Sequence, residues 1–460
     1  MRTSPSSNVL HVAAGAVSAG AIVLLLSLTS PLRLQGGDTV PGRLGMATLA
    51  CRGNQDLSDV DWVARLVAKG TRVYLVRPAL EGRGLVSSFG PGPAWIGSLV
   101  PLGVEPGALV TDEHLKHRAR VAASSAVALA AGLVVVGASA HVAPLIAAFL
   151  GLAAAVSFAG VATLAQGLWQ QTAALPLLAG ALAAMLWCGR VPRLLPAAAL
   201  CASCAAWIRP ADLPVLVLIG AGAAHLSLRA ERSLVTVATA LVAACLGAAG
   251  VLAWDLWYLD TPWPVAQWSA NARITEHVFS LSARDVFTGL TGLSLSWGRG
   301  VVWFAPLVPL FVGLAVAAWR RARSEAAVAA ICLAAGIAGQ WVLAGWFFKW
   351  WGGVGFGPRL LAETVWVAAG GTALLVSHAG ARARLALLVA CALGVAIGAL
   401  GLARSDVGAN ELELDRIHRA EAYFAWSAAP WNWTPSKYEL LDAPPGPFVY
   451  CAEHSLGAVN

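Results

Sequence analysis

Long apolar runs recur along almost the whole sequence and constrain the fold more than any other feature. About 20 mostly apolar residues are enough for a helix to cross a bilayer, because the hydrocarbon core is about 30 Å thick. Such runs lie near 9–30, 121–140, 142–163, 172–188, 194–208, 211–228, 233–253, 301–318, 326–345, 361–377 and 385–403. They predict an all-α, polytopic transmembrane protein with about eleven spans.

The composition agrees with this fold class. Of the 460 residues, 58% are hydrophobic and only 12% are charged, whereas a soluble domain has about 25% charged residues. The chain is therefore not a soluble globular enzyme, a disordered protein or a nucleic-acid-binding domain. The eight cysteines are scattered, and we interpret the Cys201-x-x-Cys204 pattern inside an apolar run as inert.

The arginines of the short connections predict the orientation of the chain. If the proline-containing segment 93–110 does not cross, four basic connections fall on the same side as the N-terminus. They carry Arg190 and Arg193, Arg229 and Arg232, Arg320, Arg321 and Arg323, and Arg382 and Arg384. The positive-inside rule makes this side cytoplasmic, so we interpret 93–110 as a juxtamembrane or re-entrant segment.

This orientation divides the chain into two parts. Residues 1–403 form a transmembrane core whose first outer loop, 31–118, is long enough to carry juxtamembrane helices. Residues 404–460 form an extracytoplasmic tail. Most acidic residues then lie outside, where we expect the chemistry of the protein.

Two acids of the first outer loop are candidate functional residues. Asp38 follows the first span and precedes a predicted short surface helix, and Asp56 precedes an amphipathic stretch at 57–69. From spacing alone, each also fits a helix N-cap.

Several polar, glycine- and tryptophan-rich motifs follow Asp38 in order along the chain. They are Val86-Ser87-Ser88-Phe89-Gly90-Pro91-Gly92-Pro93, Leu168-Trp169-Gln170-Gln171, Ile208-Arg209-Pro210, Trp297-Gly298-Arg299-Gly300 with Phe304-Ala305-Pro306, and Trp350-Trp351-Gly352-Gly353-Val354-Gly355-Phe356-Gly357-Pro358-Arg359. With Asp38 and the later Gly53, this order resembles a bacterial branch of the GT-C superfamily. Members of that superfamily are polytopic glycosyltransferases that use polyprenyl-phosphate-linked sugars. The last motif is the most specific part of the resemblance.

The resemblance implies roles for the two acids. Asp38 would be the general base that takes the proton of an acceptor hydroxyl, and Asp56 would bind the acceptor or act as a second acid. The chain departs from the family at Asp38-Thr39, where many members have an Asp-Glu pair, and at Gln171, where the branch often has a histidine. We expect no cofactor and no metal site, with a divalent metal as the alternative.

A lipid-phosphate leaving group needs cations at the depth of the membrane surface. The candidates next to outer span ends are Arg118, Arg120, Arg209, Arg299, Lys349 and Arg359. Arg299 and Arg359 are favoured because neighbouring glycines let the backbone approach a ligand closely. Each cation also fits ordinary interfacial snorkelling.

Tryptophan is unusually frequent, with 20 residues against 5 tyrosines and 12 phenylalanines. Many of them fit an interfacial belt. Trp350 and Trp351 are the candidates for contact with a sugar or an isoprenoid chain, because they lie in the most specific motif.

The sequence therefore predicts an inverting membrane glycosyltransferase of cell-envelope glycan biosynthesis. Its expected location is the outer face of a bacterial cytoplasmic membrane. Its expected partners are a polyprenyl-phosphate-linked sugar and an acceptor glycan, lipid or protein. The alternatives are a transporter or flippase of a lipid-linked glycan, in which ionisable residues near span centres are typical, and a non-catalytic membrane scaffold.

Overall fold

The fold is taken from a computed structural model of the chain. It describes residues 5–30, 39–58, 60, 63–64, 76–78, 84–87, 90–101, 103, 109–259, 282–347, 350, 357–376, 379–403 and 449–450. Asp38, Lys349 and Trp351 lie outside these residues, as does the tail 404–460 apart from 449–450.

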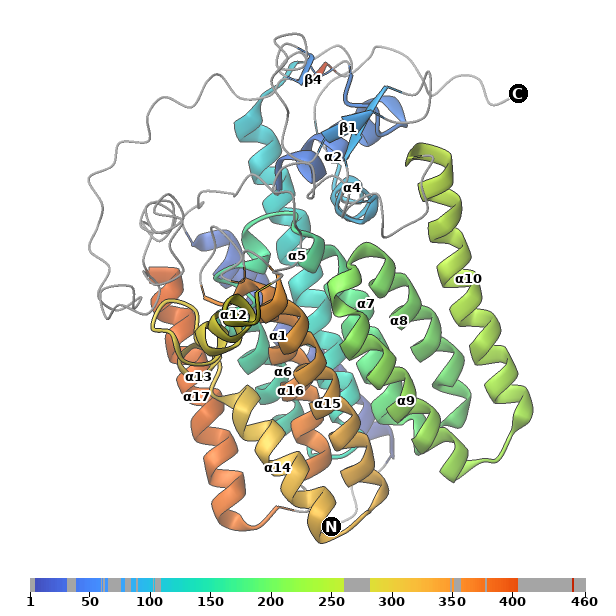
Figure 1. Ribbon diagram of the computed structural model, residues 1–460, viewed down its shortest axis with the longest axis vertical. Coiled ribbons are helices and arrows are strands. Elements are labelled where there is room, and N and C mark those ends of the chain that lie inside the picture. The colour runs from blue at the N-terminus through green and yellow to red at the C-terminus, as the bar shows by residue number, and fades with distance from the viewer. Residues whose placement is uncertain are drawn as a thin grey trace.

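Apolar helices form the body of the molecule (Figure 1). They are α1 (Pro5–Thr29), α5 (Asp112–Ala138), α6 (Pro144–Val156), α7 (Gln170–Cys188), α8 (Leu195–Ile208), α9 (Leu213–Ala230), α10 (Leu234–Leu259), α14 (Leu307–Arg321), α15 (Glu325–Trp346), α16 (Ala362–Val376) and α17 (Ala381–Ala403). Within the described residues, eight helical stretches are long and apolar enough to cross a membrane, and two shorter apolar helices lie at Pro144–Val156 and Pro192–Ile208. The prediction of an all-α membrane protein is confirmed at this level.

Short elements cover one end of this helical body, at the top of Figure 1. We call them the cap. They are α2 (Val40–Arg52), β1 (Val76–Pro78), β2 (Leu85–Ser87), α4 (Gly92–Ser98), β3 (Leu109–Val110) and β4 (Val449–Tyr450). The strands pair antiparallel as β1 with β2 and β3 with β4. With seven residues, α4 is far shorter than the about 20 residues that a span requires.

The cap has an apolar core of its own. Buried residues of α2 pack with Leu57, Val60 and Val63 and with the first turns of α5. The predicted surface helix is therefore present as α2, but residues 41–48 are all buried. Its glycines allow this burial, since a Cβ on Gly42 would lie 2.8 Å from the Pro93 side chain of α4.

Small residues also bring the helices of the body close together. A Cβ on Gly137 of α5 would lie 2.7 Å from the Ala183 Cα of α7, and one on Gly151 of α6 would lie 2.7 Å from the Ala131 carbonyl oxygen. Such close backbone approach is typical of membrane helices, because van der Waals packing drives their association.

Two predicted spans differ from the observed helices. The apolar run 142–163 contains only the 13-residue helix α6, and the buried chain turns after Val156. Gly160 permits this turn, since a Cβ there would lie 1.8 Å from the Ala155 carbonyl oxygen. The run 301–318 is divided at Pro306 into α13 (Val301–Phe304) and α14, because proline restricts the residue before it. The predicted span 361–377 instead corresponds to the apolar stretch Arg359–Val376, in which the single turn η5 (Arg359–Leu361) leads directly into α16.

Side chains satisfy the buried backbone after α6. The Thr172 hydroxyl donates to the Leu164 carbonyl oxygen at 2.8 Å, and Trp169 Nε1 donates to the Thr163 carbonyl oxygen at 3.2 Å. Irregular backbone is tolerated at membrane depth only where protein groups bond it. The turn η2 (Leu164–Gln166) thereby links α6 to α7 within the core.

The basic connections lie together at the end opposite the cap. The order and antiparallel arrangement of the helices place the connections α7–α8, α9–α10, α14–α15 and α16–α17 there, near the N-terminus (Figure 1). These connections contain the arginines from which the sequence analysis predicted the orientation of the chain in the membrane.

Candidate functional site

Segments far apart in the sequence meet at the capped end of the helical body. The guanidinium carbon of Arg359 lies 4.2 Å from the centroid of the Trp169 ring. Arg209 Nη2 donates to the Leu360 carbonyl oxygen at 3.4 Å. Two of the sequence motifs are thereby in direct contact, and a third bonds the residue that directly follows the last motif.

Close approaches at two glycines connect the other two motifs, those that contain Gly92 and Phe304, to the three motifs above. A Cβ on Gly357 would lie 2.7 Å from the Phe304 side chain, and one on Gly92 would lie 2.6 Å from the Ile208 side chain. All five sequence motifs therefore contribute to one contiguous region. We call the region formed by Gly92, Trp169, Arg209, Phe304 and Arg359 the motif region.

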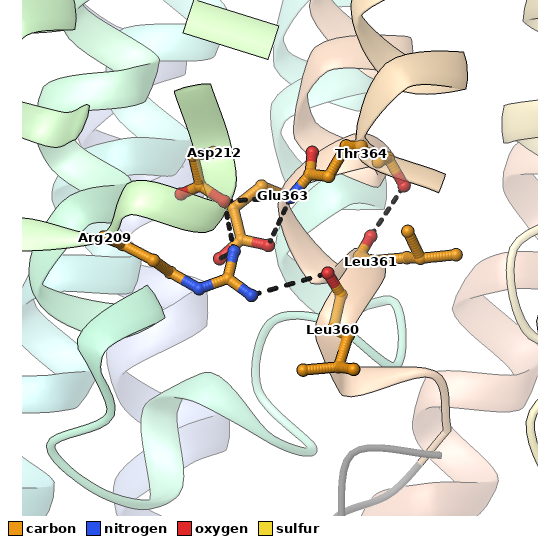
Figure 2. Close-up of polar contacts among 7 residues, drawn as sticks. Arg209, Asp212, Leu360, Leu361, Glu363 and Thr364 are labelled. Atoms are coloured by element: carbon orange, nitrogen blue, oxygen red, sulfur yellow. Dashed lines mark hydrogen bonds and ion pairs between the residues drawn. The ribbon is translucent and has the colours of Figure 1, made fainter. Parts of the chain in front are cut away.

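A buried ion cluster lies beside it (Figure 2). Arg209 Nη1 forms ion pairs with Asp212 Oδ1 and, at 2.8 Å, with Glu363 Oε1. Gln340 Nε2 donates to Asp212 Oδ1 at 2.8 Å and to Glu363 Oε2 at 3.5 Å. These four residues join the α8–α9 connection, which includes η4 (Pro210–Asp212), to α15 and α16.

The four side chains of this cluster are buried, and Asp212 and Glu363 are fully buried. One guanidinium faces two carboxyl groups, so its charge is neutralised within the protein. Breaking such a buried ion pair is costly because it leaves a charge without a partner. The observed contacts of Arg209 are therefore those of a residue that joins helices. The sequence analysis named Arg209 as a candidate but not its two carboxyl partners, Asp212 and Glu363.

The sequence does contain a signal for the three residues of this cluster that the sequence analysis did not name, Asp212, Gln340 and Glu363. Asp212 follows Arg209 by three residues, and Gln340 and Glu363 interrupt long apolar runs. A polar or ionisable residue within a span normally finds a partner inside the bundle. Which partner it finds depends on the packing of α9, α15 and α16.

Arg359 is held by the backbone before it and by Trp169. Gly357 has a left-handed conformation with φ of 76° and packs against Phe304 and Phe158, whose rings meet edge to face at 6.0 Å. Arg359 is 7% exposed. A guanidinium on an aromatic face is attracted electrostatically to the ring.

Arg299 is fully buried in the tight turn between α12 (Ala283–Leu295) and α13. Its backbone N–H donates to Ser296 Oγ at 3.1 Å, and its Nη1 donates to the Gly298 carbonyl oxygen at 3.0 Å. Trp297 of this turn stacks on Trp303 of α13, with the ring centroids 4.4 Å apart.

The other predicted cations and tryptophans lie elsewhere. Arg118 is half-buried on α5 beside Gly103 of the cap, where a Cβ would lie 2.8 Å from its Nη2. Trp350 is 3% exposed and packs on α12, since a Cβ on Gly292 would lie 2.2 Å from its ring. Through this packing, Trp350 connects the start of the last sequence motif to α12. Lys349 and Trp351 lie outside the described residues.

Asp56 holds the backbone of the cap. Its Oδ1 accepts hydrogen bonds from the backbone N–H groups of Ser58 at 2.9 Å and Leu85 at 3.0 Å. Gly84 is required beside it, since its φ is 79° and a Cβ would lie 2.1 Å from Asp56 Oδ1. These contacts connect the end of α2 to β2. Asp38 lies outside the described residues and directly precedes Thr39, which is buried at the start of α2.

Arg43 anchors the cap to the helical body, and Arg120 joins two helices of the body. Arg43 of α2 pairs with Asp112 at 2.6 Å, and burial lowers the pKa of Arg43 while the Asp112 charge partly opposes this shift. Arg120 of α5 donates to the carbonyl oxygens of Ser27 and Ser30. Both contacts fix how the chain leaves α1 and enters α2, on either side of Asp38.

The described residues contain no group of three or more His, Cys, Asp or Glu side chains arranged to hold a metal ion. Comparisons of the chain with protein-family models, curated proteins and solved structures found no match.

Proposed function

We propose that this protein is an inverting membrane glycosyltransferase. It moves a sugar from a polyprenyl-phosphate donor to an acceptor at the outer face of a bacterial cytoplasmic membrane. The cap and the motif region form its extracytoplasmic reaction site, and the N-terminus is cytoplasmic.

One observation carries this proposal. The motifs on which the resemblance to GT-C glycosyltransferases rests occur far apart in the sequence but contact one another at the capped end, through Arg359–Trp169, Arg209–Leu360, Gly357–Phe304 and Gly92–Ile208. Segments that serve one site must meet in space, whereas unrelated interfacial turns have no reason to do so.

The proposed reaction breaks one bond and forms one. The acceptor oxygen attacks the anomeric carbon as the bond from that carbon to the phosphate oxygen breaks, and the electron pair leaves with the lipid phosphate. The Asp38 carboxylate takes the hydroxyl proton. Arg359 stabilises the charge on the departing phosphate, and Arg299, in the turn between α12 and α13, is the second candidate cation for this role.

The distribution of arginines supports the proposed orientation. The basic connections lie at the end opposite the cap, and short basic loops favour the cytoplasmic side. This orientation brings the cap to the face where polyprenyl-phosphate sugars are presented to extracytoplasmic acceptors.

The test uses the purified full-length protein in lipid nanodiscs with a panel of polyprenyl-phosphate sugars and acceptor fractions. Loss of the lipid-linked sugar and gain of the glycosylated acceptor are measured together. We expect turnover with one donor class and its loss in Asp38→Asn. Arg321→Ala, at the opposite end of the body, is the matched control and is expected to keep activity.

The buried ion cluster favours a second candidate, a transporter or flippase of a lipid-linked glycan. Two carboxyl groups and a guanidinium buried between helices are typical of ion-coupled carriers. Vesicles that contain the protein separate the candidates. Transfer of a labelled lipid-linked glycan between leaflets without consumption of any donor would refute the transferase proposal.

A further inference from the structure

The cap contains a disulfide-bonded cysteine. Cys51 lies in the last turn of α2 and is disulfide-bonded. The free cysteines of the described chain are Cys188, Cys201, Cys204, Cys245, Cys332 and Cys391. The sequence contains eight cysteines, so the partner that remains within this single chain is Cys451.

The described backbone supports this pairing. Strand β4, Val449–Tyr450, directly precedes Cys451 in the sequence. It pairs antiparallel with β3 of the cap, with Tyr450 opposite Leu109 and Val449 opposite Val110, and it also contacts α2. The chain just before Cys451 is therefore held beside the helix that contains Cys51, which a disulfide requires because its two Cα atoms lie within about 7 Å of each other.

We propose that a Cys51–Cys451 disulfide fastens the C-terminal tail to the cap and that it forms on the extracytoplasmic side of the membrane. Both thiols lose their protons, and one S–S bond forms between the two sulfur atoms. The two electrons pass to the disulfide of an extracytoplasmic oxidant protein, which is reduced to two thiols by thiol–disulfide exchange.

The distribution of the cysteines agrees with this placement. The free cysteines all lie on helices of the body, α7, α8, α10, α15 and α17, whereas Cys51 lies in the cap. Disulfides persist in oxidising compartments and are rare in the cytosol. The bond therefore places the cap outside by an argument that does not use the arginines, and it does not depend on the proposed enzymatic activity.

Thiol counting tests the bond in the full-length protein purified from membranes without reductant. The protein is denatured and treated with a maleimide, and the modified thiols are counted by mass spectrometry before and after reduction. We expect six reactive thiols before reduction and eight after it. Peptide mapping should recover one cross-linked pair that contains Cys51 and Cys451.

Variants distinguish this pairing from others. In Cys51→Ser, the thiol of Cys451 should become reactive, and reduction should then add no further thiol. Cys245→Ser is the matched control, because Cys245 is exposed and free, and it should leave the cross-linked peptide intact. Eight reactive thiols before reduction, a pair that joins Cys51 to another cysteine, or a bond between two chains would each overturn the proposal.

Removing the thiol oxidant of the host tests whether the disulfide forms on the extracytoplasmic side of the membrane. Expression in a host that lacks its extracytoplasmic thiol oxidant should leave eight reactive thiols in membrane-inserted protein. If the bond forms equally well in that host, the extracytoplasmic placement is wrong even though the pairing is right.

Discussion

The guanidinium of Arg359 lies on the ring of Trp169, with 4.2 Å between the guanidinium carbon and the ring centroid. The contact joins the turn before α16 to the segment before α7 at the capped end of the body. It directly connects the last sequence motif, which ends at Arg359, to the chain that turns after α6.

Replacement of Arg359 tests its proposed role toward the donor phosphate. We expect Arg359→Ala to lower kcat/KM for the donor by about 100-fold or more, since removal of one stabilising donor typically costs this much. Arg359→Lys should recover part of the rate, because it keeps the charge and loses the planar guanidinium. Donor consumption by each purified variant is the measurement, and Arg321→Ala is the control. Unchanged kinetics in Arg359→Ala would remove this residue from the site.

Gly357 is expected to be intolerant of a side chain. Its φ is 76°, and a Cβ would lie 2.7 Å from Phe304, so Gly357→Ala should lower the free energy of unfolding by about 1–3 kcal/mol. Gly313→Ala is the matched control, because nothing lies within 4 Å of a Cβ there. In α14 that change should be neutral or slightly stabilising, since alanine favours helix over glycine. Thermal unfolding followed by tryptophan fluorescence compares the two, and equal melting temperatures would contradict the prediction.

The buried ion cluster predicts a contrast between two substitutions. Arg209→Met leaves Asp212 and Glu363 without their cation, so we expect a loss of about 3–5 kcal/mol of stability. Glu363→Gln keeps the Arg209–Asp212 pair and should cost much less. The melting temperature of each detergent-purified variant is the measurement. A stable Arg209→Met variant that has lost donor binding would instead assign Arg209 to the phosphate.

The two acids of the cap predict different outcomes. Asp56→Ala removes the acceptor of two backbone hydrogen bonds and should cost about 1–3 kcal/mol of stability. Asp56→Asn keeps one acceptor oxygen and should be mild in both stability and turnover. Asp38→Asn should abolish turnover without unfolding the protein. The reverse pattern, with Asp56→Asn inactive and Asp38→Asn active, would make Asp56 the base.

Orientation predicts which engineered cysteines are labelled from outside. Ala322→Cys, in the α14–α15 connection, should not react with a membrane-impermeant maleimide in intact cells. Leu99→Cys, at the end of α4 where the side chain is 77% exposed, should react. The opposite pair of results would reverse the orientation of the chain.

The span positions could be predicted from sequence because the length and apolarity of a helix are local properties. The apolar runs at 121–140, 326–345 and 385–403 correspond to α5, α15 and α17. The prediction was less accurate where a single glycine or proline redirects the chain. Gly160 allows the turn after α6, and Pro306 separates α13 from α14, although the apolar composition continues past both residues.

The partners of the polar residues could not be predicted in this way. Arg209 was recognisable as a cation at a span end. Its ion pair with Glu363, and the hydrogen bonds of Gln340 to the two carboxyl groups, exist only because α15 and α16 pack beside the α8–α9 connection. The burial of α2 likewise depends on α4, which approaches it at Gly42.

By itself, the sequence determined that this chain is an all-α membrane protein, since its long apolar runs leave no other stable environment. Only the tertiary structure decided that the five motifs share one end of the molecule, that Asp56 bonds backbone in the cap and that Arg209 is neutralised by two carboxyl groups. The physical reason is that hydropathy acts along one segment, whereas a site is made of short-range contacts between segments that the order of the chain does not specify.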